Sequence, residues 1–258
     1  MSAARPVVIK VGGAALVGGA LEDLPELLSA GHKVAVVHGG GVQLTRMLDA
    51  LGIPTRFHAG LRVTDEATLE VAEIVLAGGV NKNLARWLAG LGVPSAGISG
   101  TDGPTLVVEP VPDLGRVGKV VRVETRLIEA LWSGGFVPVV APLGVGPEGA
   151  YNVNADSAAA SLAVGLGAGH LFLMTDVDGL LREGETVEVI APEKCEDYVE
   201  RGLAAGGMVP KLRAAAEAAR GGVEARILNG NKKGALAAAV AGGRVGTLIS
   251  EGVAACKQ

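Results

Sequence analysis

Short apolar runs alternate along the chain with segments whose apolar residues follow helical spacing. Runs almost free of polar side chains occur at residues 6–11, 34–38, 136–141, 171–174 and 225–228. Continuous apolar runs of this length are typical of strands that are buried on both faces of a parallel sheet. The sequence therefore predicts a strand at each of these five places.

Helical patterns lie between the predicted strands. Two segments carry apolar residues at positions i, i+3, i+4 and i+7, which share one helical face: Leu44, Met47, Leu48 and Leu51, and then Leu84, Trp87, Leu88 and Leu91. The alanine-rich segments 155–166 and 211–220 are helical by propensity. This alternation predicts an α/β fold, a three-layer α/β/α sandwich with an open, mainly parallel central sheet.

Residues 105–123 depart from the alternation. Two β-rich stretches flank the turn sequence Pro-Asp-Leu-Gly at residues 112–115, a pattern that predicts an added β-hairpin. Because no linker interrupts the chain, we expect one domain over residues 1–258. A soft boundary near Asn152 would divide it into an N-terminal lobe, about residues 1–151, and a C-terminal lobe, about residues 152–258.

Composition excludes several classes of function. The net charge of the 258 residues is −4 and aromatic residues make up only 3%, which argues against a nucleic-acid surface. No apolar run approaches the about 20 residues of a membrane span. The two cysteines, Cys195 and Cys256, form no metal-type cluster and no disulfide framework. With no leader pattern before the first strand, we expect a cytoplasmic protein.

Two glycine-rich turns follow predicted strands, where ligands of open α/β sheets bind. Lys10 is followed by Val11, Gly12 and Gly13, and offers a cation beside closely approachable backbone. The run His38-Gly39-Gly40-Gly41 precedes a helix, and its backbone N–H groups suit an anion. The alternative for Lys10 is a lysine whose charged end extends from the strand end into solvent, and the alternative for the glycine run is an ordinary flexible turn.

Two polar clusters precede predicted helices. Arg62, within Gly-Leu-Arg-Val-Thr, is a candidate bidentate partner of a carboxylate or phosphate, although a lone arginine here is also typical of a solvated surface. Asn152, Asn154 and Asp156 precede the alanine-rich helix. An N-cap explains one of these three residues but leaves the other two without a role.

Two further loops carry candidate chemistry. The loop at 175–181 is acidic, contains Gly179 and follows an apolar strand, so it could hold a nucleotide or form only a turn. Gly206 and Gly207 open a helix in which Lys211 lies near the N-terminus, where phosphate binds well. A surface lysine in a first helical turn is the alternative interpretation.

In chain order, the motifs VIKVGG, VVHGGG, GLRVT, NVNAD, TDVDGLL and GGMVPK resemble those of the amino acid kinase family. The resemblance runs from about Val8 to the C-terminus. KxGG and GGMxxK are shared broadly within that family. The trio HGGG, GLRVT and NVNAD is narrower and resembles members that use ATP to phosphorylate the side-chain carboxylate of N-acetyl-L-glutamate, in arginine biosynthesis.

The resemblance implies a role for each matching residue. Lys10 and Lys211 would flank the transferring phosphoryl group, and Asp156 would orient both lysines. The acid, held in the N-terminal lobe, would be bound by Gly40, Gly41, Arg62, Asn152 and Asn154. The nucleotide, held in the C-terminal lobe, would be bound by Gly12, Gly13, Asp176, Val177, Asp178, Gly179, Leu180, Leu181, Gly206, Gly207 and Met208.

The implied cofactor is ATP with Mg²⁺ bound mainly through the nucleotide phosphates, with no metal site of the protein's own. A side-chain carboxylate, with an unperturbed pKa near ~4.3, is already an anionic nucleophile at neutral pH. Catalysis would then depend on positioning the two substrates and neutralising their charges.

The resemblance also bears on assembly and alternatives. Arginine-inhibited, hexameric members carry an extra helix before the first strand, whereas Lys10 comes nine residues after Met1, so we expect a homodimer that arginine does not inhibit. The alternatives are a kinase for a related acid, such as a carrier-linked aminoadipate, and a catalytically silent amino-acid sensor. A regulatory signalling partner and a role for residues 229–233 stay open.

Overall fold

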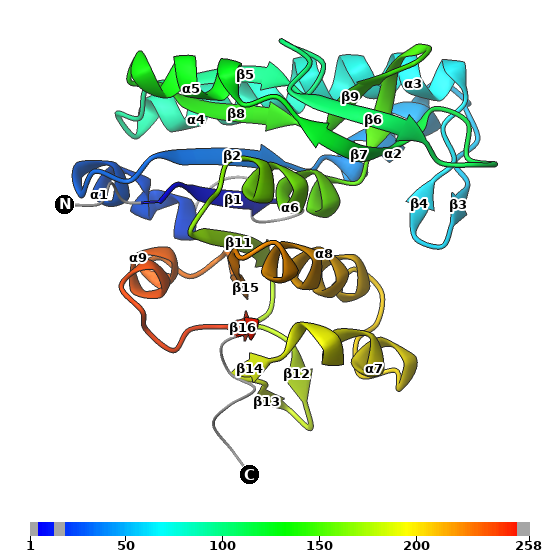
Figure 1. Cartoon of the computed structure of the whole chain (residues 1–258). Helices are drawn as coiled ribbons and strands as arrows, with labels where there is room; N and C mark the ends of the chain where they lie inside the picture. The colour runs from blue at the N-terminus through cyan, green and yellow to red at the C-terminus, as the bar shows by residue number, and fades with distance from the viewer. Residues whose placement is uncertain (1–4, 13–18, 252–258) are drawn as a thin grey trace. The chain divides into compact units, whose positions relative to one another are not determined.

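The structure, a computed structural model, describes residues 5–12 and 19–251. The chain divides into two compact units, which are described separately here. The first unit combines residues 1–34 with residues 159–258, and the second unit is the continuous stretch 35–158 (Figure 1). The lobes expected on either side of Asn152 stay a prediction.

The first unit contains the strands that precede the motifs expected to bind the nucleotide. Its elements are β1 (Val7–Val11), η2 (Gly19–Asp23), α1 (Leu24–Ser29), β11 (His170–Thr175), β12 (Leu181–Arg182), β13 (Glu185–Thr186), β14 (Val189–Ile190), η4 (Pro192–Lys194), α7 (Cys195–Glu200), α8 (Met208–Arg220), β15 (Glu224–Asn229), α9 (Ala235–Val240) and β16 (Thr247–Ile249). Helix α6 (Ala155–Gly165) begins in the second unit and continues into the first.

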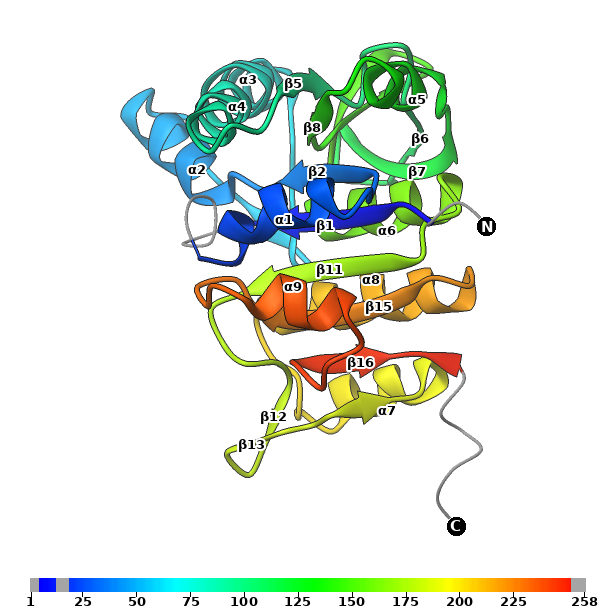
Figure 2. The ribbon, with the colours of Figure 1, turned by 90° about the vertical axis from the view of Figure 1, so that its left-hand side faces the viewer.

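The strands of the first unit run in the order β14-β16-β15-β11-β1. All neighbouring pairs are parallel except β15 with β16. Helix α9 lies on one face of these strands and α8 on the other (Figure 2). Because β1, β11 and β15 are parallel, the residues that follow them emerge at one edge of the sheet.

The second unit contains the motifs expected to bind the acid. Its elements are β2 (Val34–His38), α2 (Gly41–Ala50), β3 (Phe57–His58), β4 (Leu61–Arg62), α3 (Glu66–Ala72), the π-helix η3 (Glu73–Val80), α4 (Asn81–Gly90), β5 (Ser95–Ser99), β6 (Leu106–Pro110), β7 (Val117–Val123), α5 (Arg126–Ser133), β8 (Val137–Ala141), β9 (Leu143–Gly146) and β10 (Gly149–Val153).

Within the second unit, β2, β8 and β5 form a parallel run of strands. Helices α4 and α5 lie on opposite sides of β8 and β5 (Figure 2). The hairpin predicted at residues 105–123 is confirmed as β6 and β7, which pair antiparallel. With β9 and β10 these two strands close into a four-stranded barrel.

The burial pattern explains why the apolar runs form strands. Every residue of β1, β2 and β8 is buried, and a fully buried Val, Leu or Ile side chain contributes roughly 1.5–3 kcal/mol. The predicted α/β/α fold with mainly parallel strands is confirmed. Among the described residues, none of the helices is both long and apolar enough to cross a membrane.

One predicted helical face differs from expectation. In α2 only Leu44 and Leu48 are buried, while Met47 and Leu51 are 43% and 58% exposed. The spacing correctly predicted a helix, but the core covers only part of the apolar face. At the start of α3, Asp65 is the N-cap, because its carboxylate accepts the Thr68 N–H at 2.8 Å.

Candidate functional site

The turn after β2 is built so that only glycine fits at one of its positions. Gly40 has φ of 152°, and a Cβ there would lie 2.6 Å from Leu76 Cδ2. At Gly41, by contrast, a Cβ would meet nothing within 4 Å. Gly41 begins α2, and the first N–H groups of a helix have no acceptor within the helix. The turn thus presents backbone donors and a positive helix end to an anion.

Arg62 lies at the end of β4 and is only 8% exposed. Its Nη2 donates to Thr45 Oγ1 at 2.8 Å and to the Gly41 carbonyl at 3.2 Å. Burial lowers the pKa of the guanidinium, and the charge of Asp49 opposes this shift, yet an arginine stays protonated in proteins. Among the described residues, every hydrogen bond of Arg62 goes to a neutral oxygen. A carboxylate ligand would supply the counter-charge.

Thr64 connects two predicted substrate residues. Its hydroxyl is fully buried, donates to the Arg62 carbonyl at 2.8 Å and accepts from Asn152 Nδ2 at 3.1 Å. The predicted residues Arg62 and Asn152 are therefore linked through one side chain. No role was predicted for Thr64 from the sequence, although its place within the GLRVT motif was a usable signal.

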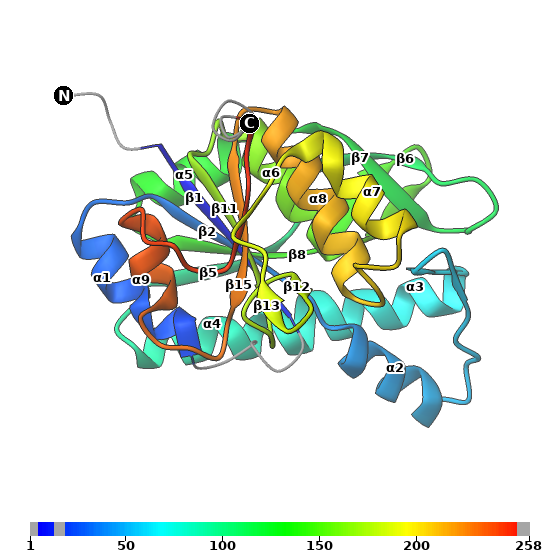
Figure 3. The ribbon, with the colours of Figure 1, turned by 90° about the horizontal axis from the view of Figure 1, so that it is seen from below.

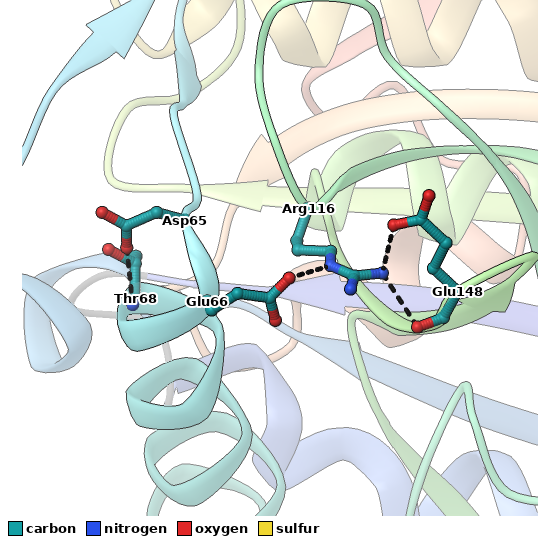
Figure 4. A network of polar contacts seen from close by, with 5 residues as sticks. All are labelled: Asp65, Glu66, Thr68, Arg116 and Glu148. Atoms are coloured by element: carbon teal, nitrogen blue, oxygen red, sulfur yellow. Dashed lines mark hydrogen bonds and ion pairs between the residues drawn. The ribbon is translucent and has the colours of Figure 1, made fainter.

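Arg116 fastens the segment that carries Thr64. Its Nε lies 2.6 Å from Glu66 Oε1, and its Nη1 lies 3.0 Å from Glu148 Oε2 (Figure 4). The Arg116 N–H also donates to the Thr64 carbonyl at 2.6 Å. The hydrogen bond to Glu66 is the main cause that raises the pKa of Arg116. These bonds tie the start of α3 to the barrel strands of the same unit.

Asn154 has a clear structural role. Its Oδ1 accepts the backbone N–H groups of Asp156 and Ser157 at 3.0 and 3.1 Å, so it caps α6. Its assignment to the substrate stays a prediction. Asp156 is buried in the first turn of α6, where a carboxylate is stabilised by the helix dipole.

In the first unit, Lys10 is the fourth residue of β1 and is buried, opposite Leu173 of β11. A buried ammonium at a strand end is held there at a desolvation cost, which fits a functional group better than a surface lysine. Gly12 follows β1, whereas Gly13 lies outside the described residues.

The loop after β11 is shaped by Gly179. This glycine has φ of 146°, and a Cβ would lie 2.6 Å from Thr247 Oγ1. The next residue, Leu180, is buried and donates its N–H to the same hydroxyl at 2.8 Å. Asp176 and Asp178, which precede Gly179, are exposed, whereas Leu181, which follows it, begins β12.

The structure gives residues 229–233 a place that sequence reasoning missed. Asp178 Oδ1 accepts from Asn229 Nδ2 at 2.9 Å and lies 2.7 Å from Lys232 Nζ. The bond to Lys232 is the main cause that lowers the pKa of Asp178. Because β11 and β15 are parallel neighbours, the loops that follow them had to meet. That topological argument was the available signal.

Helix α8 begins where the glycine pair predicted it. Gly206 has φ of 53°, Gly207 is the N-cap, and Lys211 lies in the first turns. Helix α7 runs beside α8 (Figure 3), and Arg213 Nε joins them through Glu196 Oε2 at 3.1 Å. Lys211 is thereby placed near a helix end that attracts phosphate. A joint role for Lys10, Asp156 and Lys211 stays a prediction.

Known proteins resemble the chain over nearly its whole length. The amino acid kinase family matches residues 5–229. An acetylglutamate kinase from Rubrobacter xylanophilus is 72% identical, with 96% of this chain and 98% of that protein covered. An acetylglutamate kinase from Novosphingobium aromaticivorans is 41% identical, with coverages of 88% and 83%.

A solved structure also resembles the chain. An N-acetylglutamate synthase from Neisseria gonorrhoeae, solved with coenzyme A and N-acetyl-glutamate, superposes with a TM-score of 0.81 and 30% identity. The match covers 95% of this chain and 59% of that one. Because the family match spans most of the chain and the two relatives match 96% and 88% of it, the chain belongs to the amino acid kinase family.

Proposed function

We propose that the protein transfers the γ-phosphoryl group of ATP to the side-chain carboxylate of N-acetyl-L-glutamate, forming an acyl phosphate for arginine biosynthesis. The observation that carries this proposal is the 72% identity to an acetylglutamate kinase over 96% of the chain. The buried, cationic Arg62 beside the glycine turn supports an acidic substrate in the second unit.

The chemistry needs no general base, because the attacking carboxylate is ionised at neutral pH. We assign the binding of the acid to Arg62, to Asn152 and to the backbone donors of Gly40 and Gly41. Lys10 and Lys211 would neutralise the charge that develops during transfer, and Asp156 would orient them. If each lysine acts as an oxyanion donor does, its loss costs about 10²–10³-fold in rate.

We assign ATP to the glycine turns and loops of the nucleotide side, with Mg²⁺ carried by the triphosphate. Over residues 5–12 and 19–251 no group of three or more His, Cys, Asp or Glu side chains is arranged to hold a metal ion. The N-terminal lobe, about residues 1–151, would hold the acid, and the C-terminal lobe, about residues 152–258, would hold ATP.

We also propose that the protein is a cytoplasmic homodimer. Large apolar side chains are exposed at the C-cap of α2, on β3 and on the π-helix of the second unit, where Leu51, Phe57 and Ile74 are 58%, 59% and 62% exposed. Surfaces of this kind mark contacts between proteins. Light scattering of the wild type and of Leu51→Glu would test this surface, since a dimer of the variant as stable as that of the wild type would exclude it.

The test of function is ADP release from Mg-ATP with a panel of acceptors, namely N-acetylglutamate, glutamate, aspartate, aminoadipate and UMP. We expect turnover with N-acetylglutamate alone. Turnover with another acid would keep the phosphoryl-transfer chemistry and reject the assigned substrate. ATP binding without turnover on any acceptor would reject the assigned substrate and favour an amino-acid sensor or a kinase for a carrier-linked acid.

A further inference from the structure

A buried side-chain network lies beneath the glycine turn of the second unit. His38 and Asn81 are both fully buried, although 43 positions separate them. Asn81 Nδ2 lies 3.1 Å from His38 Nε2, 2.8 Å from the Val139 carbonyl and 3.0 Å from the Ile98 carbonyl. His38 Nδ1 lies 2.6 Å from the Gly39 carbonyl. The network therefore runs from α4 to the turn itself.

These contacts determine the orientation of the Asn81 amide. Its Oδ1 lies 3.2 Å from Lys82 Nζ, a donor, whereas its Nδ2 faces three acceptors. The opposite orientation would place a carbonyl oxygen against two backbone carbonyls and the NH₂ group against an ammonium. The contacts therefore favour the orientation with Nδ2 toward His38, in which the two hydrogens of the NH₂ group are shared among three acceptors.

The contact with the Gly39 carbonyl indicates one tautomer of His38. A carbonyl oxygen only accepts, so the Nδ1 that faces Gly39 carries the hydrogen. Nε2 then accepts from the Asn81 amide. A ring protonated on both nitrogens would set an N–H group against the Asn81 NH₂ group. Asn81 thus favours a neutral imidazole that donates from Nδ1.

The turn is also supported on its other side. The π-helix η3 places Leu76 and Val80 against Gly40, at 2.6 and 3.3 Å from where a Cβ would stand. Asn81 is the next residue after this π-helix. One continuous stretch of chain therefore packs against Gly40 and holds the ring that bonds Gly39. Gly97 makes room for it, since a Cβ there would lie 2.0 Å from Asn81 Oδ1.

We propose that Asn81 is a positioning residue for the acidic substrate. By fixing the Nδ1–H tautomer of His38, it holds the Gly39 carbonyl and so sets the direction of the Gly40 and Gly41 N–H groups. The proposal rests on the assignment of the acid to this turn, as proposed above. Oriented donors of this kind lose effect with small displacements. Loss of the relay, the chain of contacts from Asn81 through His38 to the Gly39 carbonyl, should therefore raise the KM for the acid about 10- to 100-fold.

The first experiment needs only the wild type. The chain has four histidines, so ¹⁵N NMR of the labelled imidazoles gives four ring signatures, and His38→Asn identifies that of His38. We expect a neutral ring with hydrogen on Nδ1 at pH 7. Hydrogen on Nε2, or on both nitrogens, would overturn the proposal. This readout does not depend on turnover, so it stands even if the substrate assignment fails.

Kinetics of three variants give the second test. Asn81→Asp replaces the donor to Nε2 by an acceptor, and we expect a higher KM for the acid with an unchanged KM for ATP. His38→Gln removes the donor near Gly39 and should also raise the KM for the acid. His38→Asn keeps a donor near the Nδ1 position, so its KM for the acid should lie between that of His38→Gln and that of the wild type. Asn83→Ala, an exposed control on the same helix, should change neither KM.

A merely structural role predicts a different pattern. Equal changes in both KM values, or a loss of thermal stability with the acid KM unchanged in the folded fraction, would overturn the proposal. If Asn81→Asp does not fold, His38→Gln and the wild-type spectrum still decide it. Absence of wild-type turnover on N-acetylglutamate would reject the proposed function and leave the tautomer result as the test of the relay.

Discussion

Two regions of this protein, the glycine turn after β2 and the loop after β11, are held in different ways. Around the glycine turn of the second unit, His38, Arg62, Thr64 and Asn81 are all buried and hydrogen-bonded. After β11, Asp178 and Lys232 form their ion pair with both side chains about half exposed. Buried networks hold one geometry, whereas exposed pairs are weak. The polar groups around the glycine turn are therefore held more firmly than the Asp178–Lys232 pair.

The sharpest way to break this comparison is Arg62→Met. Loss of the buried guanidinium should lower kcat/KM for the acid by about 10²–10³-fold, or about 3–4 kcal/mol, because the charge-assisted contact of a largely buried cation disappears. Steady-state kinetics at saturating ATP measure it. Arg122→Met, on an exposed barrel strand beside Glu124, is the matched control and should leave kcat/KM unchanged. Less than a 5-fold loss would contradict the assignment of Arg62.

Two neighbouring glycines give the next largest contrast. Gly40→Ala should destabilise the protein by about 1–3 kcal/mol, because its backbone angle and Leu76 both oppose a Cβ. Gly41→Ala has open space and begins a helix, so its stability should stay within about 1 kcal/mol of the wild type. Urea unfolding compares them. We expect Gly41→Ala to raise the KM for the acid despite normal stability; equal stabilities of the two variants would contradict the packing argument.

The cap of α6 separates a structural role from a binding role. Asn154→Ala should cost about 1 kcal/mol of stability, because the N–H groups of Asp156 and Ser157 lose their acceptor. Asn154→Ser keeps an acceptor and should recover most of that stability. If Asn154→Ser is stable but the KM for the acid still rises, Asn154 contacts substrate as well as capping the helix. If both the stability and the KM for the acid of Asn154→Ser return to the wild-type values, capping the helix is the only role of Asn154.

The smallest effect is expected at Asp178. Asp178→Asn should raise the KM for ATP only about 2- to 5-fold, because the pair with Lys232 is exposed and screened. Lys232 lowers the pKa of Asp178 in the folded state, so the pair contributes stability above the unfolded pKa of about 4 and loses it as pH falls through the lower, folded pKa. Acid unfolding curves of the wild type and Asp178→Asn should therefore converge at low pH. A larger loss of activity in Asp178→Asn than in Arg62→Met would contradict the comparison between the two regions.

Sequence patterns predicted the strands and helix ends that depend on neighbouring residues along the chain. The buried runs of β1, β2 and β8 and the helix start at Gly207 follow from local spacing and glycine conformation. The relay of Asn81 could not be predicted in this way, because its partner His38 is brought close only by the order of β2, β8 and β5. An asparagine at the start of an amphipathic helix looks like any polar surface residue.

The candidate site also contains residues that could be predicted from local sequence and residues that could not. Motifs located the glycine turns and Arg62, because those residues act through properties visible in sequence, such as backbone freedom and charge. They missed Asn229 and Lys232, whose contact with Asp178 depends on parallel pairing of β11 and β15. They also overestimated the buried face of α2, since periodicity cannot tell whether a partner covers Met47 and Leu51.

The π-helix η3 has a consequence for how this protein tolerates changes in length. A π-helical turn holds more residues than an α-helical turn, and each residue of an α-helix turns the chain by roughly 100°. Deleting one residue within Glu73–Val80 would let the segment tighten into an ordinary α-helix that turns the chain by about the same total angle, so α4 would keep its face toward His38. Deleting a second residue would rotate that face by roughly 100° and separate Asn81 from His38. Single-residue deletions in this segment should therefore be tolerated better than deletions of two residues.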